Sequence, residues 1–482
     1  SIILYMNSSL IAQNARLQSL GYPNLGGINL IEDISDVLTF PADIALSTNL
    51  AQGCVGAGYV YTAKEFLDLF SVGLLFGLPS YTTNNLGGNS SFHTALNNAY
   101  TAANNYPFHT GTPTGNPVPG EGNFDLTMPT APTNTGHLLL GMELGSSICV
   151  GIDVFREASH SKTDEKDVYT AAGPTGPSTE TRENKGFSKY GCLGTILGAN
   201  LDLGTNIRIK AAFGIANLYH KAEMVHSGQN VSTTTVTYNT ETSNMEAISG
   251  LYLPFLVKGA IDIGNHTLTS AINYTIDFYQ FEAKFDDGDP GTTAEPPYKS
   301  DKYTNTYMGL GVCDEIKLTS QTHLIAALSI ARISSKTTPE NIDNDNREIT
   351  NYTNIFPYTS LGIEHQIKNW WKFDEIILRA GGNKSVTWTS AKEEGGDALE
   401  KRSNVQTSSA FNWTTGLSLI KGKLELSMVI TPASWNSLWF IGGAGPAGTN
   451  VTLTYYFGNH RQAHTSSGIL PEPANKETEE PF

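Results

Sequence analysis

The sequence predicts an all-β fold, a transmembrane antiparallel up-and-down β-barrel of about 14 strands with a small N-terminal plug segment. Three observations predict this class: low charge content, segments of alternating apolar and polar residues, and connections of two different lengths. We expect residues 1–49 to form an N-terminal arm and lumen plug. Residues 50–457 would form the barrel with long extracellular loops, and residues 458–482 a flexible periplasmic tail.

The composition indicates that, if the chain crosses a membrane, it does so with strands and not with helices. Only 39% of the 482 residues are hydrophobic, the mean hydropathy is −0.21, and no run of about 18 apolar residues occurs, which excludes a helical span. Charged residues make up 16%, below the roughly 25% of soluble domains. Glycine is frequent at 47 residues, with 21 Tyr and 20 Phe. This mixture suits strands with one face in lipid and the other in a lumen.

Alternation along the chain is the strongest strand signal. Ile207, Ile209, Ala211, Phe213 and Ile215 form one apolar face about as long as the 9–11 residues that a tilted strand needs to cross hydrocarbon. The same period of two recurs in residues 148–154, 193–201, 268–276 and 424–430. One such strand would also fit a soluble β-sandwich. A series of them favours the barrel.

The connections between these segments alternate in length. Tight turns occur at residues 145–147, 204–206, 264–266, 319–321, 369–372 and 421–423. Polar stretches that resemble surface loops lie between them, at residues 81–135, 157–185, 225–244, 286–302, 334–351 and 390–404. An up-and-down barrel places all short turns at one rim and all long loops at the other, as outer-membrane barrels do. A soluble sandwich or propeller has no reason to do so.

Charged residues on the strands are expected to face the lumen, because a charge on the lipid face costs about 2–4 kcal/mol at the midplane. They would set the selectivity of an open channel, hold a plug in a closed one, or simply pair across the lumen. Aromatic residues near predicted strand ends suit the membrane interface. The predicted lumen-facing charges are Asp153, Arg208, Lys210, Asp277, Glu364 and Arg379.

Metal, cofactor, nucleic-acid and catalytic signatures are weak. The net charge of −16 argues against a nucleic-acid partner. Cys54, Cys149, Cys192 and Cys313 form no C-x-x-C pair; their even number allows disulfides in an oxidising envelope, but three of them fall inside predicted strands, which favours packed thiols. Acidic runs at residues 286–289 and 343–346 could bind calcium but are more typical of solvated loops. His460 and His464 lack a third ligand in view, and no nucleophile elbow is present. We expect no cofactor, no metal and no enzymatic activity.

The last predicted strand, Val451–Phe457, has Val451, Leu453, Tyr455 and Phe457 on one face. A terminal amphipathic strand that closes on Phe resembles the signal by which barrel proteins are recognised for outer-membrane insertion. The polar tail after it would be mobile in the periplasm or dock an envelope protein. We expect a secretory signal to have been removed before residue 1, with residues 1–12 as its remnant or as an ordered arm.

Residues 14–49 are similar to the N-terminal region of the long-chain fatty acid transporter family. The similarity rests on Asn14–Gly21 and on Ile31–Ala42, where Pro41 and Ala42 match an Asn-Pro-Ala motif and Phe40 replaces its Asn. The resemblance implies a 14-stranded barrel with an N-terminal plug. Independently, residues 30–38 carry the spacing of a short amphipathic helix, which fits either a piece packed in a wide pore or a soluble cap. The predicted plug residues are Ile31, Ile34, Val37, Leu38, Phe40, Pro41 and Ala42.

These expectations favour a pore of the bacterial outer membrane that contacts membrane lipid and passes small or hydrophobic solutes. The alternative is an outer-membrane anchor or sheath that binds an envelope partner and transports little. An outer-membrane lipase or protease is a third class, for which the sequence shows no nucleophile and base at a rim.

Overall fold

The computed structural model describes residues 15–21, 24–25, 28–46, 49–55, 59–66, 70–77, 134–145, 147–173, 176–231, 236–286, 298–299, 302–338, 340, 348–394, 405–430 and 451–457. No helix in these ranges is long and apolar enough to span a membrane. Loop residues 81–133, the acidic runs at 287–289 and 343–346, and the tail with His460 and His464 lie outside the described residues.

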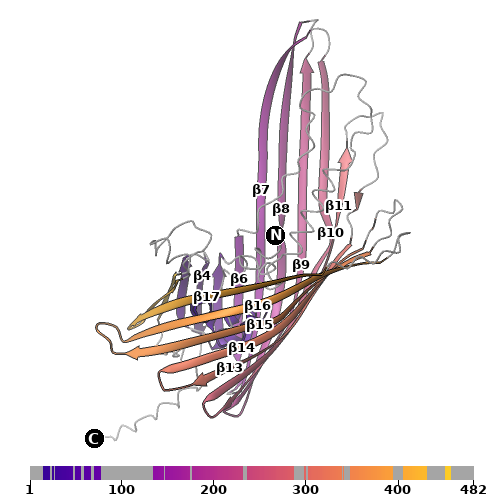
Figure 1. Ribbon diagram of the computed structural model, residues 1–482. Coiled ribbons are helices and arrows are strands. Elements are labelled where there is room, and N and C mark those ends of the chain that lie inside the picture. Colours follow the sequence, from indigo (N-terminus) through magenta and orange to yellow (C-terminus); the bar gives the residue numbers. More distant parts are fainter. Residues whose placement is uncertain are drawn as a thin grey trace.

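The main sheet is a closed antiparallel barrel (Figure 1). It contains 16 full strands, β3 to β11 and β13 to β19, with the two-residue strand β12 added beside β11. Pairing of β9 with β10 on one side and of β19 with β3 on another leaves no open edge in the ring. The predicted all-β barrel is therefore confirmed, with 16 strands where the sequence indicated about 14.

The strands differ greatly in length. β7 to β10 have 25 to 28 residues, whereas β3 and β19 have six. The bounds are β3 Leu50–Val55, β4 Tyr59–Phe66, β5 Phe70–Phe76, β6 Asn134–Glu143, β7 Ile148–Gly173, β8 Gly176–Leu203, β9 Ile207–Val231, β10 Val236–Ile263, β11 His266–Asp286, β12 Tyr298–Lys299, β13 Lys302–Lys317, β14 Thr322–Thr338, β15 Glu348–Lys368, β16 Glu375–Glu394, β17 Gln406–Lys421, β18 Leu424–Ile430 and β19 Val451–Tyr456.

Several stretches that we interpreted as loops are strands. Residues 157–173 and 176–185 continue β7 and β8, whose pairing runs to Gly173 opposite Gly176. Residues 225–231 and 236–244 continue β9 and β10. Residues 334–338, 348–351 and 390–394 likewise belong to β14, β15 and β16. Apolar alternation fades in these segments because they extend beyond lipid, while backbone pairing persists. The four long strands project as tall hairpins from one rim (Figure 1).

The opposite rim carries short turns and is called the short-turn rim below. It joins β6 to β7, β8 to β9, β10 to β11, β13 to β14, β15 to β16 and β17 to β18. Gly204 (φ 72°) and Gly264 (φ 63°) occupy the left-handed region there, which residues with a Cβ rarely adopt. Glycine thus permits the tight reversals that the sequence indicated.

Side-chain burial follows the predicted period of two. In β9, Ile207, Ile209 and Phe213 are 37%, 37% and 53% exposed, while Lys210 and Ala212 between them are buried. A barrel whose outer face is a band of exposed apolar side chains is stable only where hydrocarbon surrounds that band.

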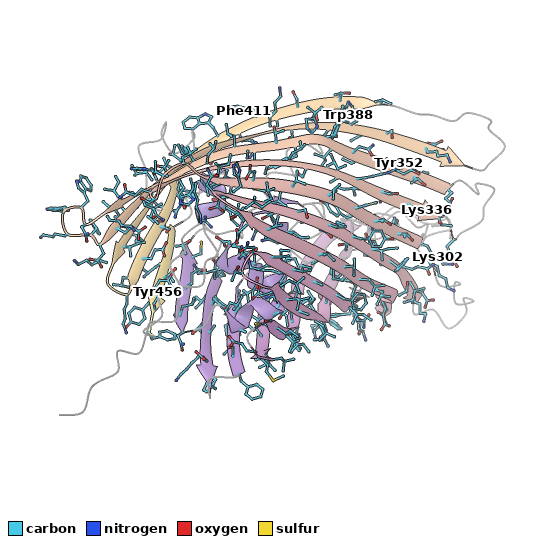
Figure 2. The ribbon with its side chains drawn as sticks, turned by 90° about the horizontal axis from the view of Figure 1, so that it is seen from below. Lys302, Lys336, Tyr352, Trp388, Phe411 and Tyr456 are labelled. Carbon is cyan, nitrogen blue, oxygen red and sulfur yellow. The ribbon has the colours of Figure 1, made fainter. Side chains whose placement is uncertain are left out.

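Polar and aromatic groups mark the limits of this band. Exposed ion pairs join Lys302 to Glu340 and Lys336 to Glu348 at the strand ends away from the short-turn rim. Tyr352, Trp388 and Phe411 lie along the neighbouring strands β15 to β17 (Figure 2). Aromatic rings of this kind suit the membrane interface.

The N-terminal segment, defined as the described residues 15–21, 24–25 and 28–46, lies inside the barrel against the buried face of the wall. It contains α1 (Ala15–Ser19), β1 (Asn24–Leu25) paired with β2 (Ile28–Asn29), and the 3₁₀ helices η2 (Ile34–Leu38) and η3 (Pro41–Ala45). The amphipathic helix that we expected over residues 30–38 is reduced to the single short helix η2. Asp33 is the N-cap of η2, and its carboxylate accepts a hydrogen bond from the Ser35 N–H.

We expect Ile272→Arg, in the middle of the exposed face of β11, to lower the free energy of unfolding in lipid vesicles by about 2–4 kcal/mol. The matched control is Ile263→Arg at the short-turn end of β10, which should cost about 0–1 kcal/mol because the guanidinium reaches the interface. Urea titration of both variants measures the difference. Equal costs would contradict the assignment of the exposed band to hydrocarbon.

Candidate functional site

The N-terminal segment contacts the wall at positions where the wall has no side chain. A Cβ on Gly151 of β7 would lie 2.2 Å from the Pro41 carbonyl oxygen, and one on Gly198 of β8 would lie 2.9 Å from Pro41 Cδ. A Cβ on Gly381 of β16 would lie 2.2 Å from the Leu20 carbonyl carbon. The glycines therefore allow the segment to approach the wall backbone closely at two separate places.

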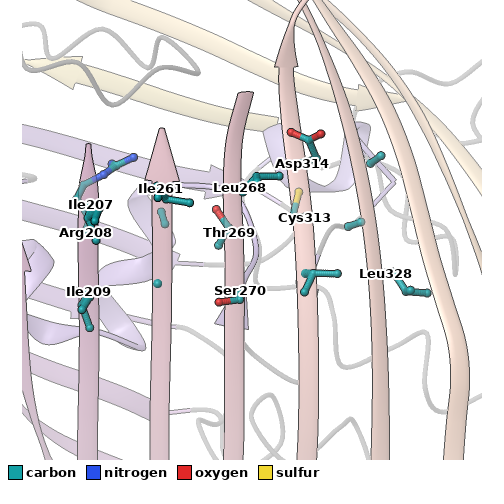
Figure 3. A pocket seen from close by; sticks show the side chains of 15 residues that line it. Ile207, Arg208, Ile209, Ile261, Leu268, Thr269, Ser270, Cys313, Asp314 and Leu328 are labelled. Carbon is teal, nitrogen blue, oxygen red and sulfur yellow. The ribbon is translucent and has the colours of Figure 1, made fainter. Parts of the chain in front are cut away.

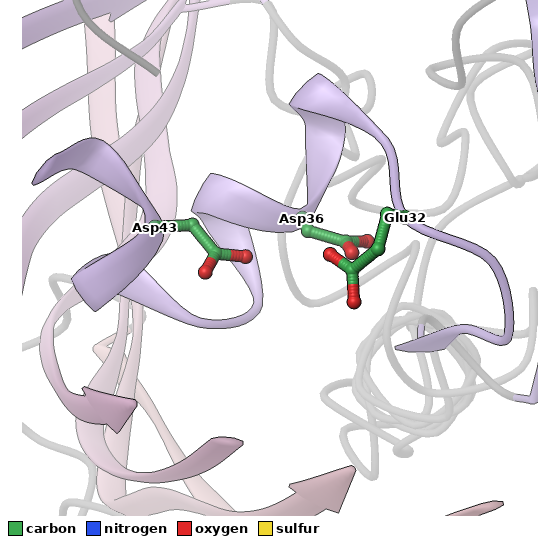
Figure 4. Close-up of side chains that lie close together, drawn as sticks. All are labelled: Glu32, Asp36 and Asp43. Carbon is green, nitrogen blue, oxygen red and sulfur yellow. The ribbon is translucent and has the colours of Figure 1, made fainter. Parts of the chain in front are cut away.

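The first contact area is an ion-pair cluster, which we call the acidic junction. Glu32, Asp36 and Asp43 of the segment place carboxylate oxygens within 4.8 Å of one another (Figure 4). Lys210 of β9 donates to Glu32 at 2.5 Å and to Asp43 at 2.9 Å. Lys258 of β10 donates to Asp36 at 2.9 Å and lies 3.6 Å from Glu32. Two wall ammonium groups thus hold three segment carboxylates.

Amide groups complete the acidic junction. Asn29 donates to Asp36 at 2.6 Å, and Asn200 of β8 donates to Asp43 at 2.6 Å. Three carboxylates so close together could hold a metal ion. Here the lysine ammonium groups are already bonded to the same carboxylates, so the arrangement acts as an electrostatic contact between segment and wall.

The charges of the acidic junction do not balance, which affects its protonation. Burial would raise the pKa of Glu32, but Lys210 and Lys258 outweigh it and hold this pKa well below its usual range. Burial raises the pKa of Asp36 to about 7, although Lys258 opposes the shift. With two lysines facing three carboxyl groups, Asp36 is the group that takes up a proton near neutral pH.

The second contact area, which we call the arginine junction, joins α1 to the far side of the wall. Arg16 lies 3.2 Å from Glu364 of β15, and Arg379 of β16 donates to the same carboxylate at 2.6 Å. Arg379 also donates to Ser418 of β17 at 2.6 Å. All three charged side chains are almost completely buried. Such charges persist in an interior only when paired and hydrogen-bonded.

The segment also buries apolar side chains in the lumen. Ile31, Ile34, Val37, Phe40 and Ala42 are each at most 5% exposed, Pro41 is buried, and Leu38 is partly buried. Phe40 packs in a cluster with Phe155, Leu256 and other wall residues. The predicted plug residues are therefore buried or partly buried on the lumen side of the wall.

The predicted lumen-facing charges fall into two groups. Lys210, Glu364 and Arg379 contact the N-terminal segment or its partners, as described above. The other three pair within the wall: Asp153 lies 2.9 Å from His137 Nδ1, Asp277 accepts from Asn305 at 3.1 Å, and the half-buried Arg208 lies 3.8 Å from Asp262.

Sequence reasoning missed Lys258, Arg16, Glu32, Asp36 and Asp43. Lys258 could have been found, because residues 252–260 of β10 alternate and Lys258 falls on the same face as Leu256 and Ala260. The three acids carried no comparable signal, since acidic side chains before a barrel are most simply solvated. Cys54, Cys149, Cys192 and Cys313 all lie buried in strands as free thiols.

Together these features define a bacterial outer-membrane β-barrel. The strands pair in a closed ring, a band of large apolar side chains on them is exposed, and the buried charged side chains of the strands lie on the opposite, lumen-facing side. In outer-membrane barrels generally, the short turns face the periplasm and the longer connections face outward.

The chain is similar in structure to a FadL homologue of Pseudomonas aeruginosa, at 11% sequence identity, 88% coverage of this chain, 94% coverage of that chain and a TM-score of 0.38. It is also similar to the toluene transporter TodX of Pseudomonas putida, at 10% identity, 92% and 98% coverage and a TM-score of 0.36. No protein-family model matches the chain, and no curated protein matches its sequence significantly.

We expect Gly151→Ala to displace the N-terminal segment, because its Cβ would overlap the Pro41 carbonyl, at a cost of about 1–3 kcal/mol. Gly136→Ala on the neighbouring strand β6 is the control, since its Cβ would meet only the Phe76 ring at an ordinary 3.7 Å. The rate of amide hydrogen exchange in residues 41–45 should rise in Gly151→Ala and not in Gly136→Ala. Unchanged exchange in Gly151→Ala would contradict the close contact between Gly151 and Pro41.

Docking of the segment should depend on pH through Asp36. A carboxyl whose pKa is raised by docking contributes stability that is lost as pH rises through that value, here about 7. Glu32, whose pKa is lowered, contributes stability that is lost as pH falls below the ordinary Glu range. Protection of residues 28–46, corrected for intrinsic exchange, should therefore be greatest at about pH 4 and should fall between about pH 4 and 7. Asp36→Asn should abolish this fall, and an unchanged profile would refute this assignment.

Proposed function

We propose that the protein is an outer-membrane transport barrel whose N-terminal segment closes the lumen and opens it by release from the wall. The observation that carries this proposal is the acidic junction, where Lys210 and Lys258 bind three carboxylates of a segment that is not itself part of the wall. A barrel of 16 strands encloses more space than its wall side chains fill. A removable segment is one way to close that space.

The nature of the contacts favours a closure that can be reversed. Replacing buried ion pairs by well-packed apolar residues is often neutral or stabilising, so ion pairs are not needed to hold the segment permanently. They do make docking sensitive to proton and salt concentration.

The proposed cargo is a small solute with a substantial apolar part. Phe155, Tyr252, Leu256 and Ile325 are buried on the lumen side and form one cluster with Leu17 and Leu20 of the segment. When the segment leaves, these wall side chains would line part of the path. An apolar lining with a few charged groups suits hydrophobic solutes better than ions.

Single-channel conductance in planar bilayers tests the proposal. Lys258→Met keeps the side-chain volume but leaves Asp36 without its ammonium partner, and we expect about 3 kcal/mol less docking energy, or about a hundredfold larger open-to-closed ratio. Lys336→Met is the control, because its pair with Glu348 is exposed and worth at most about 1 kcal/mol. Deletion of residues 14–49 should give the largest conductance.

Two results would decide against the proposal. A folded barrel whose conductance is unchanged by the deletion would show that the segment does not close the pore. A barrel that passes neither ions nor hydrophobic probes after the deletion would favour the alternative function, an outer-membrane anchor or sheath that transports little.

A further inference from the structure

A groove of about 580 Å³ crosses the outer face of β9, β10, β11, β13 and β14 (Figure 3). It is on the outer face because each strand contributes two outward-pointing residues to it and, between them, the backbone of one inward-pointing residue. In β9, for example, Ile207 and Ile209 point outward and flank Arg208. The volume lies within the roughly 300–1,000 Å³ of small-molecule sites.

Small residues create the groove. Strand register aligns Ile209, Gly259, Ser270, Val312 and Leu328 in one row across the five strands. In this row, Gly259 and Ser270 occupy positions at which the other strands carry the large apolar side chains Ile209, Val312 and Leu328. In the adjacent row, Ala326 is likewise a small residue beside larger ones. The space lies between the two rows, bounded by exposed apolar side chains such as Leu268 and Val312.

One end of the groove carries a charged pair on the lipid-facing side. Asp314 is paired with Leu268 and Ala326 in register, so its carboxylate points outward with theirs. His266 Nδ1 lies 3.0 Å from this carboxylate, and the two side chains are 40% and 29% exposed for His266 and Asp314. His266 is the first residue of β11 and Asp314 lies near the end of β13, which places the pair close to the short-turn rim.

We propose that this groove binds a phospholipid of the inner leaflet that carries a primary ammonium headgroup, namely phosphatidylethanolamine. The groove opens within the band that faces hydrocarbon, so acyl chains are what surround it. The short-turn rim is periplasmic, which places the charged pair at the headgroup level of the inner leaflet. The Asp314 carboxylate matches an ammonium group. The ring beside it, in the protonated form that pairs with this carboxylate through Nδ1–H, donates its Nε2–H to the adjacent phosphate. A zwitterionic headgroup thus fits both members of the pair.

Native mass spectrometry of the detergent-solubilised barrel tests the proposal with phosphatidylethanolamine, phosphatidylcholine and phosphatidylglycerol of the same acyl chains. Phosphatidylcholine cannot donate a hydrogen bond from its headgroup nitrogen, and phosphatidylglycerol lacks the ammonium. We expect phosphatidylethanolamine to be retained about tenfold more than either, the factor that one charge-assisted hydrogen bond provides. Equal retention of all three, or preference for phosphatidylglycerol, would overturn the proposal.

Variants separate the headgroup from the groove. Asp314→Asn should remove the preference for phosphatidylethanolamine over phosphatidylcholine without changing the packing. Ser270→Leu with Ala326→Leu should fill the groove and abolish retention of every lipid. The matched control is Thr306→Leu, an outward position of β13 beyond the groove, which should behave as the unmodified protein.

Folding of each variant is checked by its migration on gels with and without heating. Should the double leucine variant fail to fold, Asp314→Asn alone decides the headgroup assignment. A folded double variant that retains lipid as Thr306→Leu does would overturn the assignment of the groove.

Discussion

Hydrocarbon offers the backbone no hydrogen-bond partner, and this constraint shapes the whole molecule. Every wall strand must pair on both sides within the membrane, so the sheet closes on itself through the pairs of β9 with β10 and β19 with β3. Closure with 16 strands fixes a wide interior. The residues that the lipid band excludes, mainly charged ones, are then directed into that interior. The polar lumen and the segment inside it both follow from the demands of the wall.

The strands of the barrel wall were easier to predict from the sequence than the contacts inside the lumen. Alternation in residues 207–215 predicts the faces of β9 correctly, because lipid on one side imposes a strict period of two. The same logic failed at residues 157–173 and 176–185, where the strands extend beyond the membrane and are held by backbone pairing. Backbone hydrogen bonds form with any side chain, so these segments carry no alternating apolar pattern. Hydropathy therefore reports where lipid ends, not where a strand ends.

The ion pairs of the lumen were beyond sequence reasoning for a different reason. Lys210 was expected to face inward, but its partners Glu32 and Asp43 lie 178 and 167 residues away. No local periodicity connects such positions. Only the closed ring brings β9 and β10 to the segment, and the glycines at 151 and 198 set the distance at which it docks. The resemblance of residues 14–49 to a plug motif gave the place of the segment but not the charges that hold it.

The two junctions are linked through one side chain. The acidic junction sets three carboxyl groups against two lysines, and a proton on Asp36 brings these charges into balance. Arg16 of the arginine junction pairs with Glu364 and also donates to the Glu32 carbonyl oxygen at 2.7 Å. Its guanidinium therefore connects the backbone of the acidic junction to the wall at β15. Because removal of α1 from the wall withdraws that donor from a partly buried carbonyl, loss of the arginine junction weakens the acidic junction, which makes release of the segment cooperative rather than stepwise.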